Sequence, residues 1–148
     1  MAERRYWLLK SEPSAYSYRD LQNEPDQTAE WDGVRNYQAR NTLRDEMKVG
    51  DGVLFYHSGA KHQAVIGTAV VVRKGYPDNT AWDQTSDHPD TKSTPDNPIW
   101  YMVDIKAEIE FKHQITLAEI KSTPGLENMV LVQRSRLSVQ PVSFLEWR

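Results

Sequence analysis

The chain has 148 residues, no cysteine, five tryptophans and a formal net charge of −3. This length predicts a single domain spanning residues 1–148, which can bury about two thirds of its unfolded surface without disulfides. The absence of cysteine excludes a disulfide framework and thiolate sites, and the negative charge disfavours a protein that coats nucleic acid by bulk electrostatics. No stretch reaches the ~20 apolar residues of a membrane span, and the N-terminal apolar run is too short for a signal peptide. We therefore expect an intracellular monomer without membrane contact, in a bacterial cytoplasm rather than a nucleus, since no basic targeting tail is present.

The first third of the chain predicts one strand followed by two helices. Residues 6–10 form a β-prone apolar run that ends at Ser-Glu-Pro. Ser17 and Asp20 have the spacing of a capping box, which predicts a short helix through Leu21. Residues 36–46 contain neither proline nor glycine and carry helix formers at helical spacing, so we expect a second helix there.

The remainder predicts mostly strands. Residues 53–57 and 65–74 are β-branched apolar runs joined by a hairpin signature at 58–61, and residues 100–111 alternate apolar and polar side chains with a period of two. Further expected elements are a helix capped by Thr116 and Glu119, a strand at 137–142 and a helical turn from Ser143 to Glu146. Strands outnumber helices and turns are frequent, which favours an α+β domain built on a partly closed antiparallel barrel of about five to six strands with short peripheral helices.

Negative charge is concentrated in one segment. Residues 76–104 hold six acidic side chains and one basic side chain, together with four prolines. This composition predicts a long surface loop. Loops of this length are often functional, although a solvated acidic excursion is the more common case.

Catalytic and metal signatures are weak. His57 and His62 flank the predicted hairpin, but no third ligand follows at metal spacing, so we expect no metal site and no cofactor. Lys10, Ser11 and Glu12 place an amine, a hydroxyl and a carboxylate at one strand end, where they could perform acid–base or nucleophilic chemistry. An ordinary ion pair beside a turn serine is the commoner explanation.

The most unusual segment is 31–41, Trp-Asp-Gly-Val-Arg-Asn-Tyr-Gln-Ala-Arg-Asn. Tryptophan and tyrosine usually fill cores, but amide side chains can also read the edge of a base, and aromatic rings can stack on a base that has left its helix. Arg35, Arg40 and Arg44 could contact phosphates, and the last two share one helix face. The segment is therefore a candidate for nucleic-acid binding.

Several motifs resemble the EVE domain family across almost the whole chain. They are residues 6–13 (Tyr-Trp-Leu-Leu-Lys-Ser-Glu-Pro), the 31–41 block, residues 55–58 (Phe-Tyr-His-Ser), residues 76–78 (Tyr-Pro-Asp) with Trp82, and residues 136–142. The resemblance implies a PUA-like open β-barrel related to ASCH and YTH domains, with a pocket on one face. It also implies a reader of nucleic acid, since EVE domains are associated with modified cytosine in DNA.

The resemblance further implies where a base would bind. Trp31, Tyr76 and Trp82 would form the walls, and Asn36 and Ser58 would bond the base edge. The floor would be lined or supported by Trp7, Lys10, Ser11 and Glu12, while Arg35, Arg40 and Arg44 would serve phosphates. The acidic residues of 83–98 are expected beside the groove rather than in it.

Two classes of function follow. The first is a non-catalytic module that binds a modified base, preferably modified cytosine in DNA and alternatively a base in RNA, flipped into an aromatic and amide-rich pocket. The second is a small ASCH-like hydrolase of a modified nucleoside, for which Lys10 and Glu12 would have to point into the pocket. A scaffold for a protein partner is a third possibility, which no exposed amphipathic helix favours.

Overall fold

The computed structural model describes residues 5–14, 16–59, 63–83, 85–86, 89–90, 92–124, 126, 129–133 and 137–142. Its strands are β1 (Tyr6–Ser11), β2 (Thr28–Glu30), β3 (Gly52–His57), β4 (Ala64–Pro77), β5 (Tyr101–Thr116) and β6 (Val139–Val142). Its helical segments are α1 (Tyr18–Gln22), η1 (Pro25–Gln27), α2 (Tyr37–Asn41), η2 (Thr42–Glu46), η3 (Asn79–Ala81), α3 (Leu117–Ser122) and α4 (Val130–Gln133). None of the described helices is long and apolar enough to cross a membrane.

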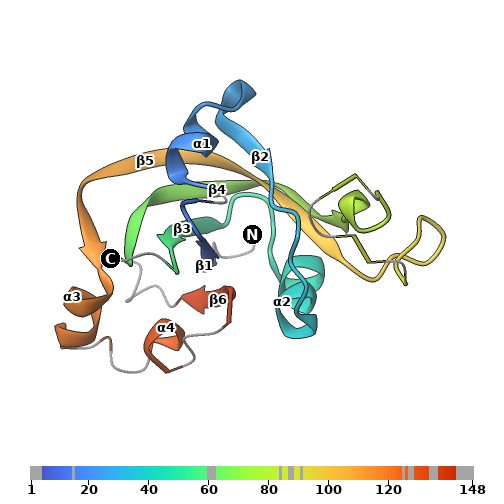
Figure 1. Cartoon of the computed structure of the whole chain (residues 1–148). Coiled ribbons are helices and arrows are strands. Elements are labelled where there is room, and N and C mark those ends of the chain that lie inside the picture. Colours follow the sequence, from blue (N-terminus) through green and yellow to red (C-terminus); the bar gives the residue numbers. More distant parts are fainter. Residues whose placement is uncertain are drawn as a thin grey trace.

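The strands form one open sheet in the order β2-β5-β4-β3-β1-β6, with the short helices around it (Figure 1). The predicted α+β fold is confirmed, with one difference in strand direction: β1 and β3 pair in parallel, with Tyr6 opposite Gly52. Parallel neighbours need a long crossover, and the helices and loops between these two strands provide it. The short alternating runs predicted the strands but carried no signal for their relative direction.

Strands β4 and β5 run side by side across the molecule and curve strongly (Figure 1). Their register shifts on both sides of Gly67, which marks irregular pairing at the bend. A Cβ at position 67 would lie 2.5 Å from the carbonyl oxygen of Ile109 and 2.8 Å from the ring of Tyr18. Only glycine therefore allows β5 and the α1 tyrosine to approach β4 this closely.

The central strands are buried on both faces, which explains the continuous apolar run at the start of the chain. Trp7 and Leu9 of β1 belong to one core cluster, whereas the intervening Leu8 belongs to another with Tyr56 of β3. The first cluster also contains Trp31 and lies on the side of the sheet that carries α1 and α2. The second cluster packs under α3 and α4.

The predicted helices begin where their caps indicate. Ser17 and Asp20 form the capping box of α1, and the Thr116 side chain accepts from the Glu119 amide at the start of α3. Asn36 precedes α2 as its N-cap, and the helix continues through Glu46 as the π-helical turn η2. The segments η1, β2, η3 and α4 were not predicted, because three or four residues are too few to show a period.

The loop predicted at 76–104 is bounded by β4, which extends to Pro77, and by β5, which begins at Tyr101. Between them lie η3 and a bridge between Thr94 and Asn97. The predicted turn from Ser143 to Glu146 and residues 60 and 61 of the predicted hairpin turn lie outside the described residues.

Candidate nucleic-acid interface

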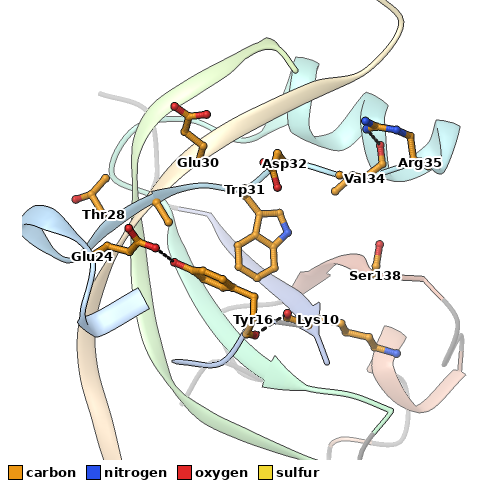
Figure 2. Close-up of a pocket in the computed structure, with 13 residues that line it drawn as sticks. Lys10, Tyr16, Glu24, Thr28, Glu30, Trp31, Asp32, Val34, Arg35 and Ser138 are labelled. Atoms are coloured by element: carbon orange, nitrogen blue, oxygen red, sulfur yellow. Dashed lines mark hydrogen bonds between the residues drawn. The ribbon is translucent and has the colours of Figure 1, made fainter. Parts of the chain in front are cut away.

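A cavity of about 770 Å³ opens between the end of β1, the segment from Glu24 to Arg35 and the start of β6 (Figure 2). Its walls come from Lys10, Ser11, Tyr16, Glu24, Thr28, Ala29, Glu30, Trp31, Asp32, Gly33, Val34, Arg35 and Ser138. This volume is within the range of pockets that hold small ligands, roughly 300–1,000 Å³.

Two aromatic rings face the cavity. Trp31 is only 8% exposed, and its ring meets Phe55 edge to face at 5.3 Å and Tyr16 at 6.3 Å between centroids. Its backbone N–H donates to the Val103 carbonyl oxygen at 2.7 Å, which ties the segment to β5. Figure 2 shows the indole at the centre of the cavity with the Tyr16 ring below it. The site therefore offers rigid apolar surface held in place by the core.

The polar lining is mainly acidic. Glu24, Glu30 and Asp32 contribute carboxylates, against the positive charges of Lys10 and Arg35. Burial, together with the nearby Asp32 and Asp104, raises the pKa of Glu30. Such a lining repels phosphate but accepts hydrogen bonds from an amino group.

Partial burial in the cavity shifts the pKa values of Tyr16 and Lys10. The Tyr16 hydroxyl donates to Glu24 Oε1 at 3.1 Å, and burial together with that carboxylate raises the pKa of Tyr16. Burial lowers the pKa of Lys10, whose Nζ lies 5.7 Å from the centroid of the Tyr56 ring. Figure 2 shows the Lys10 side chain extending away from Trp31, so the amine lies at the edge of the cavity.

The buried carboxylate of Asp78 fixes the rim of the cavity at Gly33 and Arg35. Asp78, whose side chain is 0% exposed, accepts from the Gly33 amide at 2.8 Å and from Arg35 Nη1 at 3.0 Å. Burial alone would raise the pKa of Asp78, but hydrogen bonds from Thr80, Gly33 and Arg35 outweigh it and hold that pKa below its usual value. Asp78, near the start of the acidic segment, thus anchors the rim of the cavity at Gly33, which adopts a φ of 78°.

The structure brings together some of the residues named from the sequence. Lys10, Ser11, Trp31 and Arg35 all line the cavity. The Ser11 hydroxyl donates to the Tyr16 carbonyl oxygen at 2.7 Å, so it braces the loop after β1. Their contact with a base remains a prediction.

The expected floor residue Trp7 does not line the cavity but lies in the core. It is 1% exposed, and its Nε1 donates to Asp51 Oδ2 at 2.9 Å. Glu12 is exposed and rests against Gly59, where an added Cβ would lie 2.7 Å from Glu12 Oε1. Ser58 donates its amide to the Ser11 carbonyl oxygen at 2.9 Å without lining the cavity.

The remaining expected pocket residues also lie outside the cavity wall. Asn36 uses its side-chain oxygen to accept from the Ala39 amide at 2.9 Å, because it caps α2. Tyr76 donates its hydroxyl to Asp104 across β4 and β5, and Trp82 ends η3 with its amide bonded to Asn79. Local capping and strand pairing account for these positions, and sequence spacing could not distinguish those roles from base contacts.

The expected phosphate-binding arginines have different environments. Arg44 forms two 2.8 Å contacts with the neighbouring Asp45, so its charge is already paired. Arg40 donates to the Ile99 carbonyl oxygen at 2.8 Å and to Asn41 Oδ1 at 2.9 Å, both neutral acceptors. Among the described residues, no group of three histidine or acidic side chains could hold a metal ion.

Sequence reasoning did not name the three acidic residues of the wall as site residues, nor the other lining residues Tyr16, Thr28, Ala29, Gly33, Val34 and Ser138; the acidic ones are Glu24, Glu30 and Asp32. Asp32 and Ser138 lie within motifs that carried the family resemblance, so they could have been considered. The Glu24–Glu30 segment offered no signal, because η1 and β2 are too short to recognise.

The chain matches known proteins along almost its whole length. The model of the EVE domain matches residues 5–148. Human thymocyte nuclear protein 1 is 44% identical over 155 aligned residues, which cover 93% of this chain and 68% of the human protein. A crystal structure of the human protein in complex with 5-methylcytosine-containing DNA superposes with a TM-score of 0.91 at 43% identity, covering 97% of this chain and 93% of the other. A hypothetical protein from Leishmania major superposes with a TM-score of 0.93 at 50% identity, covering 98% and 90%.

Proposed function

The chain belongs to the EVE domain family, and from that membership we propose that it is a binding module that reads modified cytosine in DNA. The base would leave the duplex and enter the cavity beside Trp31. The observation that carries the proposal is the close likeness to a human protein whose structure contains 5-methylcytosine DNA.

The cavity chemistry supports this assignment. Flipping a base costs a few kcal/mol in lost stacking, which the rings of Trp31 and Tyr16 can partly replace. Carboxylates such as Glu30 and Asp32 can accept from the 4-amino group of cytosine, whereas thymine presents a carbonyl oxygen there. A buried methyl group adds about 0.8 kcal/mol, so hydrogen bonding must supply much of the selectivity.

The arrangement gives little support to a hydrolase. The Ser11 hydroxyl is bonded to a backbone carbonyl oxygen, and the Lys10 side chain extends away from Trp31 (Figure 2). A nucleophilic serine would need a base within hydrogen-bond reach. We therefore propose that the module binds without catalysis.

Binding should be measured by fluorescence anisotropy on matched duplexes that carry one cytosine, 5-methylcytosine, 5-hydroxymethylcytosine or thymine, and on an RNA of the same sequence. We expect the modified-cytosine duplexes to bind most tightly. Equal affinity for all of these ligands would refute the proposal.

A cavity-filling variant links the preference to this site. Thr28→Trp adds a ring at a half-buried cavity position on edge strand β2, where aromatic residues are well tolerated. It should abolish the preference for modified cytosine without unfolding the protein. Gln114→Trp adds the same ring at an exposed position near the end of β5 and should leave the preference intact.

A further inference from the structure

Tyr37 presents a large aromatic ring to solvent next to the cavity. It is 60% exposed and is the first residue of α2. Arg35, which lines the cavity, lies two residues earlier. Because consecutive Cα atoms are 3.8 Å apart, the two Cα atoms are separated by at most about 7.6 Å. An exposed aromatic side chain so close to a binding cavity calls for a functional explanation.

The ring is held firmly despite its exposure. It packs on Trp100 with 4.9 Å between centroids and 32° between planes. Trp100 is 5% exposed and is itself fixed, because its Nε1 donates to Asp90 Oδ2 at 2.6 Å. Asn36 caps the helix on which Tyr37 lies. The ring is thus presented in a defined position, which lowers the entropy cost of binding to it.

Positive charge accompanies the ring. The guanidinium of Arg40 lies 5.2 Å from the Tyr37 centroid, and that of Arg35 lies 5.5 Å from the Trp100 centroid. Arg40 bonds only to neutral acceptors in the described part of the chain, so its charge can still serve an anion. An aromatic platform flanked by arginine is suited to a base and its phosphate.

We propose that Tyr37 stacks against a base that stays in the DNA duplex next to the flipped cytosine, while Arg40 contacts the adjacent phosphate. Base flipping leaves the neighbouring bases without a stacking partner, and a side chain inserted there restores part of that contact. This inference rests on the proposed function and adds a second DNA contact outside the cavity.

The test compares Tyr37→Ala, Tyr37→Phe and wild type on the 5-methylcytosine duplex and on its unmodified counterpart. Base–aromatic stacking predicts a loss of about 5- to 150-fold in affinity for Tyr37→Ala and near wild-type affinity for Tyr37→Phe. Ile109→Ala is the matched control, because Ile109 is 58% exposed on β5. Arg40→Gln should lower the slope of log affinity against log salt by about one. Thermal unfolding of each variant checks that the fold is retained.

The outcomes separate the two proposals. Suppose that wild type prefers the 5-methylcytosine duplex, but Tyr37→Ala binds that duplex with an affinity within twofold of wild type. The stacking inference is then wrong and the proposed function stands. If wild type binds both duplexes equally and Tyr37→Ala weakens both, the stacking contact stands and modified-base reading is wrong. If wild type binds neither duplex, both are overturned.

Discussion

Replacing Asp78 by alanine should destabilise the protein and loosen one rim of the cavity. The carboxylate is fully buried and accepts from the Gly33 amide, from Arg35 Nη1 and from the Thr80 amide, at 2.8, 3.0 and 2.9 Å. Alanine would leave these donors without their acceptor. The end of β4 and the 31–36 segment would keep their own structure, but the hydrogen bonds that join them through Asp78 would be lost.

The expected loss of unfolding free energy for Asp78→Ala follows from the burial of its ion pair with Arg35. Removing one partner of a buried ion pair costs about 3–5 kcal/mol. The Arg35 side chain is 22% exposed, so water can partly replace the lost acceptor, and we expect the lower end, about 3 kcal/mol. For a chain of this size, that loss corresponds to a decrease of about 10 °C in Tm.

Urea denaturation measures the free energy of unfolding. Fluorescence anisotropy with 5-methylcytosine DNA measures the binding affinity, which shows whether binding depends on an intact rim. Asp83 provides a matched control, because its carboxylate accepts from the Thr85 amide at 2.9 Å and from the Thr85 hydroxyl at 2.6 Å but is exposed. Asp83→Ala should destabilise the protein much less than Asp78→Ala, because water can replace the lost acceptor at an exposed position. If both variants lose a similar amount of unfolding free energy and DNA binding is unchanged, Asp78 does not organise the rim.

Three further predictions test the fold. The His57 Nε2 accepts from the Tyr18 amide at 3.1 Å, and burial lowers the pKa of His57. Neutral His57 therefore stabilises the fold fully above about pH 6.5, and this contribution is lost as pH falls through the folded-state pKa. Denaturation at pH 7 and pH 5 should therefore show a larger loss for wild type than for His57→Gln, and equal losses would contradict this reasoning. Gly67→Ala should lower the urea midpoint, since a Cβ at position 67 would lie 2.5 Å from the carbonyl oxygen of Ile109; an unchanged midpoint would contradict the close approach of β4 and β5. Ser17→Ala removes the N-cap of α1 and should cost about 1 kcal/mol by the same assay, and an unchanged midpoint would count against the cap.

Local patterns in the chain were sufficient to predict the family, the α+β class and most of the strands and caps. Caps and alternating strands depend on residues within a few positions of one another, so Ser17 with Asp20 and the run from 100 to 111 could be read directly. The 31–41 block likewise indicated nucleic-acid chemistry.

Which side chains share the cavity was decided by tertiary structure. Trp7 and Trp31 are both buried tryptophans, but of the two only Trp31 lines the cavity, because it follows the edge strand β2, whereas Trp7 lies within β1 inside the sheet. Asn36 caps a helix, and Glu30 joins the wall from an edge strand of three residues. Membership in a site depends on contacts between residues far apart in the chain, which no local spacing encodes.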